Sequence, residues 1–512
     1  MSLNLHVERK PLAMAAPAAS IGMSAEWNAI TELAHAPGWV QLLRNLAEVD
    51  GVGGPNVRVG GNSADRTWWD PTRTVPLKRS CSASYSGSVC VKNAVGPSDI
   101  NAHFAAVLAP GVRGSLVYDL TMVQNASADW ANKLATGIAS SAASISGGSR
   151  ALLAYEIGNE MDLYFENGIR SPQYAPQDFV REFNSIYEPT LAMALGTRDA
   201  PFVQGGTFCC KSPFLRRTSE LIASMGGTRV LTSWSQHGYG LSQPRPGNGT
   251  GPPLRDLLSD AVISARIEKY ITPAATAAYA QRVPFVVGET NSINNGGEHG
   301  VSDTHASALW AMDWMARLML LNVTRVNFHG GLRGAYSWIG GFRDPERRAP
   351  IVRPLYLAMV AMAHTLRGGA APVASLRGHN STASDLVVAY AWKVDSTKAI
   401  RVLVVHKDVD ETGPTHVRVS LDGAADLTAG DATVAWLRAP HVSSTYGVTW
   451  GSSMGNISFD STLDGRPDGL FVPERIVPSA MPSVGSQTFT YEFKVFPCSA
   501  ALLEVAACRG GC

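Results

Sequence analysis

The feature that most constrains the fold of this chain is a regular alternation of short buried strands and helices over residues 1–365. Continuous apolar runs bounded by Gly, Pro, Asn or Asp are typical of strands that are buried on both faces. We expect eight such strands, at residues 20–26, 56–60, 115–122, 152–158, 202–207, 230–234, 285–288 and 325–328. Eight is the number that a closed parallel barrel requires.

Helical spacing of apolar residues between these strands supports the same fold. The clearest helices are expected at residues 30–47, 177–195, 303–321 and 355–365. An open doubly wound sheet shows the same alternation, but no Gly-x-Gly-x-x-Gly follows the first strand. We therefore predict an α/β fold in which a (β/α)8 TIM barrel occupies residues 1–365.

The pattern changes after residue 365, where helical periodicity gives way to short alternating strands. These are expected at residues 386–392, 400–406, 416–421 and 488–496, separated by frequent Gly and Pro. A chain of 512 residues also exceeds what one hydrophobic core usually fills. We predict a C-terminal all-β sandwich over residues 366–512.

Charge and hydropathy exclude several classes of partner. The 43 Lys and Arg residues balance 42 Asp and Glu residues, so no electrostatic footprint for nucleic acid or an acidic membrane surface exists. The longest apolar stretch, residues 308–323, is interrupted by Asp313 and Arg317, which argues against a membrane span. We expect a small or moderately charged ligand; the oligomeric state is not indicated.

Sequons and cysteines favour secretion. Residues 1–20 make a poor signal peptide, yet Asn-x-Ser/Thr sequons occur at Asn125, Asn248, Asn322, Asn380 and Asn456. We expect a secreted or extracellular glycoprotein. The seven cysteines lie at positions 81, 90, 209, 210, 498, 508 and 512. They contain no Cys-x-x-Cys, so we expect no metal site, and their pairing stays open.

Two segments ending in glutamate carry the strongest chemical signal. Ile-Gly-Asn-Glu160 and Val-Gly-Glu289-Thr each close an apolar run that is predicted to be a strand. Strands of a parallel barrel deliver their C-terminal ends to one face, so the two carboxylates would meet there. Retaining glycosidases use such a pair, one as general acid and one as nucleophile. The alternative for Glu160 is a turn that closes a strand with a solvated carboxylate.

Other polar residues follow the predicted strands. Tyr239 and His237 lie just beyond the strand that precedes Glu289, where the tyrosine could donate to that carboxylate and the histidine could donate to substrate or order the loop. Glu26, Asn62 and Asn159 end or follow other strands and could bind sugar hydroxyls. Packing roles, a helix N-terminal acid and turn residues are the respective alternatives.

These segments together resemble a known family. Ser24-Ala-Glu26, Arg58-Val-Gly-Gly-Asn62-Ser63, Gly158-Asn159-Glu160, Gly288-Glu289-Thr290-Asn291-Ser292 and Phe328-His329-Gly330-Gly331 are similar, in this order, to the β-glucuronidase and heparanase group of retaining glycosidases, glycoside hydrolase family 79. The resemblance implies that Glu160 is the acid/base, Glu289 the nucleophile and Tyr239 its hydrogen-bond partner. It implies hydroxyl binding by Glu26, Asn62 and Asn159, and a (β/α)8 barrel with a β-sandwich.

One departure from this family concerns the uronate carboxylate. Many members place a tyrosine shortly after the nucleophile, whereas this chain reads Ser-Ile-Asn294-Asn-Gly296-Gly. Asn294, Gly296 and Tyr336 are the remaining candidates to hold the carboxylate. A neutral sugar, or a uronate modified as a 4-O-methyl ether, is left open.

The sequence thus predicts a retaining exo-β-glucuronidase that acts on terminal β-linked glucuronate of glycans or glycoconjugates and needs no cofactor. An endo-acting, heparanase-like enzyme is the nearest alternative, but it should carry long basic clusters, and Arg216-Arg217 and Arg347-Arg348 are short. A non-catalytic glycan-binding protein on the same barrel is the alternative from another class.

Overall fold

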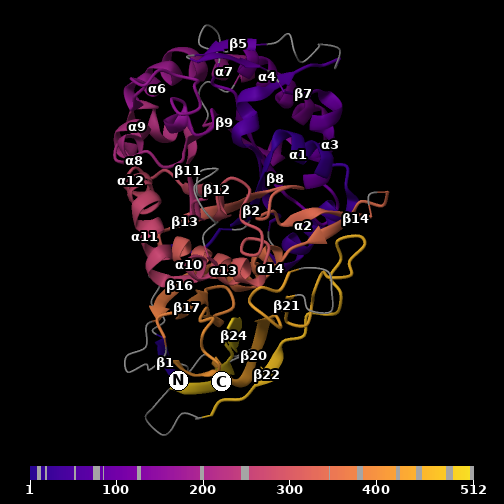
Figure 1. Ribbon diagram of the computed structural model, residues 1–512, viewed down its shortest axis with the longest axis vertical. Helices are drawn as coiled ribbons and strands as arrows, with labels where there is room; N and C mark the ends of the chain where they lie inside the picture. Colours follow the sequence, from indigo (N-terminus) through magenta and orange to yellow (C-terminus); the bar gives the residue numbers. More distant parts are fainter. Residues whose placement is uncertain are drawn as a thin grey trace.

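The chain's architecture comes from a computed structural model, which describes residues 1–7, 13–17, 20–50, 53–72, 81–84, 86–90, 92–123, 129–196, 201–243, 253–344, 346–376, 384–421, 427–445, 452–479 and 488–507. A parallel barrel forms the upper part of the molecule in Figure 1, and sheets containing both chain ends form the lower part. Among the described residues, no helix is long and apolar enough to cross a lipid bilayer.

The barrel closes through eight parallel strands of the described chain, which confirms the predicted fold class. Strand β13 pairs with β2, and the remaining strands follow in chain order around the wall. The strands are β2 (Ile21–Glu26), β3 (Asn56–Gly60), β8 (Ser115–Leu120), β9 (Leu152–Ile157), β10 (Val203–Phe208), β11 (Leu231–Leu241), β12 (Phe285–Ile293) and β13 (Val323–Gly330).

Two of these strands run further than the sequence indicated. β11 was expected to end at Trp234 and β12 at Gly288, but they continue to Leu241 and Ile293. The extensions pair with each other, with Tyr239 opposite Asn291. Polar residues can continue a strand here because both neighbours extend together and satisfy each other's backbone groups. His237 and Glu289 therefore lie inside strands and not beyond them.

Helices and short turns surround the barrel. The helices are α1 (Trp27–Leu33), α2 (Pro37–Asp50), α3 (Pro97–Val107), α4 (Asp129–Ser144), α5 (Gly148–Ala151), α6 (Pro176–Glu182), α7 (Glu188–Leu195), α8 (Ser212–Leu215), α9 (Thr218–Ser224), α10 (Leu254–Leu258), α11 (Asp260–Tyr270), α12 (Thr272–Ala280), α13 (His305–Leu320) and α14 (Pro354–Leu366). The described residues also form the 3-10 turns η1 (Gly61–Arg66), η3 (Met161–Leu163) and η5 (Gly227–Arg229) and the π-helix η4 (Phe183–Tyr187).

Two of the predicted helices are divided near prolines. The single helix expected at residues 30–47 is split into α1 and α2, because Pro37 starts a helix and cannot lie inside one. The helix expected at 177–195 is interrupted by η4, and Pro189 follows at the start of α7. Proline lacks the N–H that would continue the regular hydrogen bonding, so the chain widens into a π-turn there.

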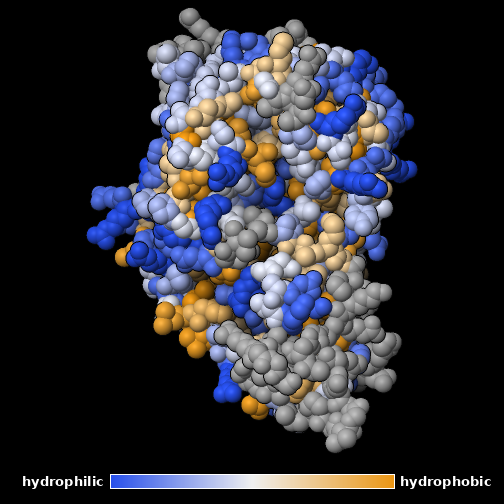
Figure 2. Space-filling view, turned by 180° about the vertical axis from the view of Figure 1, so that it is seen from behind, coloured by the Kyte–Doolittle hydropathy of each residue, from blue (hydrophilic) through white to orange (hydrophobic). Residues whose placement is uncertain are grey.

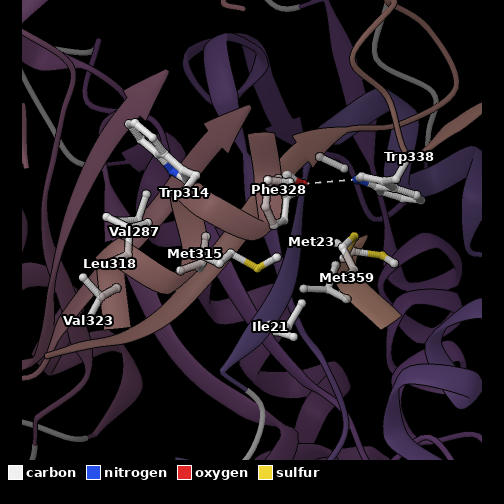
Figure 3. Packing of buried hydrophobic residues seen from close by; sticks show 14 of the residues in the cluster. Ile21, Met23, Val287, Trp314, Met315, Leu318, Val323, Phe328, Trp338 and Met359 are labelled. Atoms are coloured by element: carbon white, nitrogen blue, oxygen red, sulfur yellow. Dashed lines mark hydrogen bonds between the residues drawn. The ribbon is translucent and has the colours of Figure 1, made fainter. Parts of the chain in front are cut away.

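The outer wall of the barrel packs against α13 and α14. Figure 3 shows Val287 of β12 and Phe328 of β13 facing Trp314 and Met315 of α13. All four side chains are buried. The same cluster continues beyond the barrel into one face of the second domain, so both domains share a hydrophobic core.

The second domain consists of two packed sheets. One has the strand order β1-β19-β23; the other has the order β16-β17-β18-β24-β20-β21, with β22 beside β20. The strands are β1 (Ser2–Val7), β16 (Ala370–Leu376), β17 (Val387–Val394), β18 (Ile400–His406), β19 (Thr415–Leu421), β20 (Leu427–Arg438), β21 (Ser453–Met454), β22 (Glu474–Ile476), β23 (Phe489–Val495) and β24 (Ser499–Ala507). Buried residues of both sheets form one cluster between them, as in a β-sandwich.

The N-terminal strand corrects the expected domain boundary. Residues 1–365 were assigned to the barrel, but β1 pairs in parallel with β19, from Ser2 opposite His416 to Val7 opposite Leu421. Leu3, Leu5 and Val7 alternate with polar residues and enter the sandwich core. The chain therefore passes from the sandwich at β1 into the barrel at β2, and β1 lies in the lower part of the molecule in Figure 1.

Among the described residues, three two-stranded sheets lie outside the closed barrel. They are β4 (Thr67–Trp69) with β7 (Asn93–Val95), β5 (Cys81–Ser84) with β6 (Gly87–Cys90), and β14 (Ile339–Asp344) with β15 (Ala349–Val352). Cys90 is disulfide-bonded, and Cys81 lies opposite it in the backbone register of β5 and β6. Figure 2 shows hydrophilic residues spread over the opposite side of the molecule with hydrophobic patches between them.

A buried polar cluster joins the two domains. Asp313 of α13 accepts hydrogen bonds from Arg317 Nε (2.7 Å), Lys407 Nζ (2.5 Å) and Tyr390 Oη (2.5 Å). Lys407 and Tyr390 belong to the sandwich, and Asp313 is fully buried. The two cations hold the pKa of Asp313 below its ordinary value despite burial, which acts to raise it.

We expect Tyr390→Phe to lower the free energy of unfolding by about 2 kcal/mol, because it removes a hydrogen bond to a buried carboxylate. Denaturant unfolding would measure the change. Tyr279→Phe is the matched control, since Tyr279 is 59% exposed and should change stability little. Equal effects of both variants would contradict a specific role for the Asp313 contact.

Candidate active site

Glu289 lies in a cage of hydrogen-bond donors at the barrel mouth. Tyr239 Oη donates to its Oε1 at 2.7 Å, and Arg58 Nη1 donates to its Oε2 at 2.6 Å. His329 Nδ1 lies 3.5 Å from Oε2. Glu289 is buried, with 6% of the residue exposed. This is the environment that an ionised nucleophile requires, because each donor stabilises the negative charge.

The charge of Glu289 follows from this cage. Burial acts to raise its pKa, but His329, His237, Arg58 and the Tyr239 hydrogen bond outweigh burial and hold the pKa well below the ordinary value. Glu289 is therefore an anion at neutral pH. Conversely, burial acts to lower the pKa of His329, but the charges of Glu289 and Glu26 outweigh it and raise that pKa.

Arg58 connects Glu289 to the barrel interior. Its fully buried guanidinium donates to Glu156 Oε2 (2.6 Å), Asp119 Oδ2 (3.1 Å) and Asn159 Oδ1 (2.9 Å) as well as to Glu289. Gln204 Nε2 in turn donates to Glu156 Oε1 at 2.6 Å. A planar fork that contacts acceptors on several strands fixes the position of the Glu289 carboxylate relative to the rest of the barrel.

Tyr239 lies in the extended part of β11, two residues after His237 and on the same face of the strand. We expect Tyr239→Phe to reduce kcat about 10- to 100-fold, the usual effect of removing a hydrogen bond to a charged group. Because that bond helps to lower the pKa of Glu289, its removal raises the pKa, and the acidic limb of the pH–rate profile should move to higher pH.

Kinetic pH profiles of Tyr239→Phe and a control would test this expectation. Tyr155→Phe is the control, since Tyr155 lies on barrel strand β9 but its hydroxyl donates to Ala135 O of α4 at 3.1 Å. Tyr155→Phe should keep the wild-type pH profile. An unmoved acidic limb in Tyr239→Phe would show that its hydroxyl does not set the charge of Glu289.

Glu160 is held by its backbone at the end of β9. Its φ of 50° is in the left-handed region, and Gly158 also has a positive φ of 84°. A Cβ at position 158 would lie 2.7 Å from Met161 Sδ, so only glycine fits this turn. Glu160 N donates to Thr207 O (2.9 Å), and Thr207 Oγ1 donates to Gly158 O (2.8 Å). A non-glycine residue that adopts the left-handed backbone conformation, in a turn held by two hydrogen bonds near the barrel rim, is typical of a functional position.

The Glu160 carboxylate faces Glu289 across a short gap. His237 Nδ1 lies 3.0 Å from Glu160 Oε1, and each glutamate has a carboxylate oxygen within 4.8 Å of one on the other. Retaining glycosidases separate their carboxyl groups by about 5 to 5.5 Å, and inverting ones by about 6.5 to 9.5 Å. The observed approach fits the retaining geometry.

The same three side chains could in principle surround a cation, since their ligand atoms lie together. However, Arg58 Nη1 already lies 2.6 Å from Glu289 Oε2 and supplies a fixed positive charge. A second cation next to that guanidinium would be repelled. The geometry therefore favours acid–base chemistry over metal binding by Glu160, His237 and Glu289.

The predicted hydroxyl binders lie around this pair. Glu26 ends β2, and its carboxylate accepts Ser63 N at 2.8 Å and lies 3.8 Å from His329 Nε2. Asn159 Oδ1 is engaged by Arg58, while its Nδ2 donates to Asn62 Oδ1 at 3.4 Å. Asn62 is exposed. Asn159 thus links Arg58 to Asn62 in addition to its predicted role in hydroxyl binding. The sequence pattern did not indicate this link.

The three residues considered for a carboxylate subsite lie on adjoining loops. Asn294 is partly buried, and its Oδ1 accepts Gln243 N at 2.8 Å. Gly296 O accepts Tyr336 N at 3.2 Å, which joins the loop after β12 to the loop after β13. The Tyr336 ring lies 6.2 Å from that of Tyr239 and 5.9 Å from that of His329. The structure therefore brings the Tyr336 ring close to Tyr239 and His329, which both lie beside Glu289, and joins Tyr336 to Gly296 through the backbone.

Sequence reasoning missed three contributors. Arg58 was considered only as part of a motif, although it donates directly to the Glu289 carboxylate. His329, which contacts Ser24 Oγ at 2.8 Å, and Asp162, which holds the loop after β10, were likewise assigned no role. The sequence did contain a signal for Arg58, because this arginine lies within a strand that was predicted to be buried. A buried arginine needs several hydrogen-bond acceptors.

No family model matches the chain. It is 26% identical over 452 residues to a β-glucuronidase of Aspergillus niger, covering 80% of this chain and 77% of the relative. It is 24% identical over 314 residues to a β-glucuronidase of Neurospora crassa, covering 58% and 54% of the two chains.

Solved structures share the fold. A 4-O-α-L-rhamnosyl-β-D-glucuronidase from Fusarium oxysporum superposes with a TM-score of 0.73 at 21% identity, over 98% of this chain and 100% of the other. An arabinofuranosidase from Xanthomonas axonopodis pv. citri gives 0.62 at 15% identity, over 98% and 99%. The comparisons confirm the predicted resemblance to β-glucuronidases and the expectation of a glycoside hydrolase.

Proposed function

Starting from its likeness to β-glucuronidases along most of the chain, we propose that this glycoside hydrolase is a retaining exo-β-glucuronidase acting on terminal β-linked glucuronate. The observation that carries the proposal is the approach of Glu160 and Glu289 to within 4.8 Å, with different partners on each. Glu289 is held as an anion by Arg58 and Tyr239, whereas Glu160 contacts His237. Two carboxylates in unequal environments suit two different roles.

The mechanism follows from these roles. Glu289 attacks the anomeric carbon while Glu160 gives its proton to the glycosidic oxygen, so the leaving group departs as an alcohol and a glycosyl–enzyme ester remains. Glu160, now a carboxylate, takes a proton from water, and the resulting nucleophile breaks the ester. The sugar is released with its β-configuration, and both glutamates return to their starting states.

Substrate recognition is assigned to the residues around the pair. Glu26 and Asn62 bind hydroxyls, and Asn159, which is fastened by Arg58, directs its remaining amide hydrogen towards the hydroxyl next to the reacting carbon. Asn294 Nδ2, the backbone at Gly296 and Tyr336 Oη hold the uronate carboxylate. The Fusarium relative acts on a glucuronate that carries rhamnose at O4, so substituted terminal glucuronates, including 4-O-methyl ethers, belong in the substrate class.

A panel of aryl β-glycosides that differ only in the sugar tests the proposal. Hydrolysis should be strongest with the glucuronide, followed by its 4-O-substituted forms, and weak with the glucoside and galactoside. NMR of the first product should show the β-anomer. Preferred cleavage of a neutral glycoside, or release of the α-anomer, would contradict the assignment.

The two alternatives make different predictions in the same experiment. An endo-acting, heparanase-like enzyme would cleave a sulfated polymer and release oligosaccharides but would leave a small aryl glucuronide intact. A glycan-binding protein would hydrolyse neither substrate. The site favours an enzyme over a binding protein, because binding alone does not require a buried carboxylate held as an anion beside a second carboxylate.

We also propose that the protein is a secreted glycoprotein. Asn456 is exposed, and Asn322 is partly buried beside Met14, whose backbone N donates to Asn322 Oδ1 at 2.7 Å. Sequons Asn125, Asn248 and Asn380 lie outside the described residues. Endoglycosidase treatment of protein secreted from a eukaryotic host should reduce its mass, and Asn456→Gln should remove one step of that reduction.

A further inference from the structure

Two adjacent thiols lie beside Glu160 and have no part in the proposed mechanism. Cys209 and Cys210 follow β10, are partly buried, and are free. The two residues are neighbours in the chain, and Cys209 lies close enough to Glu160 for its pKa to respond to that charge. Cys498, the other free cysteine in the described part of the chain, lies in the sandwich.

The thiols occupy the segment that fastens the acid/base residue. Three consecutive backbone N–H groups donate to the Asp162 carboxylate: Cys209 N at 2.9 Å, Cys210 N at 2.8 Å and Lys211 N at 2.8 Å. Asp162 lies two residues after Glu160. On the other side of the pair, Thr207 O accepts Glu160 N. Any rearrangement of the Cys209–Cys210 peptide therefore acts on both supports of Glu160.

From this juxtaposition we propose that Cys209 and Cys210 form a reversible oxidation site, a dithiol that closes into a vicinal disulfide and thereby loosens Glu160. The site itself depends only on the two thiols; its effect on activity rests on the proposed acid/base role of Glu160. Small-molecule disulfides, such as oxidised glutathione, are the class of oxidant.

The chemistry proceeds by thiol–disulfide exchange. The pKa of Cys209 is raised well above its ordinary value, first by the hydrogen bond with Cys210 and then by burial and the charge of Glu160. We therefore assign the first attack to the Cys210 thiolate, which forms a mixed disulfide and expels one small thiol. Cys209 then attacks the Cys210 sulfur and expels the second. Two electrons pass to the oxidant, and the two protons end on the released thiols.

Ring closure must distort the backbone. Neighbouring Cα atoms across a trans peptide are about 3.8 Å apart, whereas ordinary disulfides join Cα atoms about 4.4 to 6.8 Å apart. All described peptide bonds are trans. Closing the ring therefore reorients the Cys210 N–H and withdraws it from Asp162. Strained disulfides have high reduction potentials, so the bond should open readily with reductant.

Mass spectrometry after incubation with oxidised glutathione tests the site directly. Trypsin cleaves after Arg198 and Lys211, so residues 199–211 form one peptide that contains both thiols and no other cysteine. That peptide should lose two hydrogen atoms on oxidation and regain them with dithiothreitol. Retention of two alkylatable thiols at full oxidation, or only a lasting glutathione adduct, would overturn the proposal.

Leaving-group dependence then tests the link to Glu160. Oxidation should lower kcat/KM about tenfold for a glucuronide with a poor leaving group, which needs the acid, and change it little for a dinitrophenyl glucuronide. Dithiothreitol should restore the rate. Cys210→Ser should abolish the response while Cys498→Ser keeps it. A change in mass without a change in rate would refute the coupling, and failure of the proposed function would appear separately as absence of hydrolysis by the reduced protein.

Discussion

Glu289→Ala is expected to lower kcat by about 10⁵-fold while leaving the fold intact, because the variant lacks the atom that attacks the anomeric carbon. The Glu289 carboxylate lies at the mouth of the barrel, and its removal creates a space lined by Tyr239, Arg58 and His329. Arg58 keeps three acceptors in Glu156, Asp119 and Asn159, so the charge network stays paired. Circular dichroism and the hydrolysis of an aryl glucuronide would measure both properties.

Chemical rescue gives this prediction its sharpest form. A small anion such as azide fits the space left by the carboxylate and can attack the anomeric carbon from the same face. Glu289→Ala with azide should therefore produce the α-glucuronyl azide at a measurable rate. Glu268→Ala serves as the control, since Glu268 is exposed on α11 and should retain full activity. Near-normal hydrolysis by Glu289→Ala would refute the nucleophile assignment.

The barrel could be predicted from sequence because its strands are buried on both faces and read as continuous apolar runs. Phe-Val-Val-Gly of β12, in which every residue is buried, is an example. The rule that parallel strands end at one face then placed Glu160 and Glu289 together without any coordinates. That rule fixes the face but not the distance or the partners.

The parts that sequence could not reveal depend on long-range pairing. β1 alternates apolar and polar residues, but nothing local states that its partner is β19, more than 400 positions away. β24 is rich in alanine, a residue with little preference for strands, and becomes a central strand between β18 and β20 through tertiary context. Arg58 gains its role only when its acceptors on β8, β9 and β12 converge.

Glu160→Ala is the second large effect and separates the two carboxylates by role. The general acid assists departure of the aglycone in proportion to its need for a proton, so the loss should follow leaving-group ability. We expect kcat/KM to fall about 10³-fold for an alkyl or phenyl glucuronide and far less for a dinitrophenyl glucuronide. Glu289→Ala, in contrast, should fail equally with both.

The second chemical step distinguishes the roles independently. With a good leaving group, Glu160→Ala still forms the glycosyl–enzyme ester on Glu289 but lacks the base that activates water, so the ester should accumulate and appear as a burst of phenol. Azide, which needs no base, should release it as the β-glucuronyl azide, the opposite anomer to that from Glu289→Ala. Glu160→Gln, which also lacks the acid, should show the same dependence on the leaving group as Glu160→Ala. It should respond less to azide, because the amide fills the space beside His237. Identical azide products from the alanine variants at 160 and 289 would exclude a double displacement at this pair.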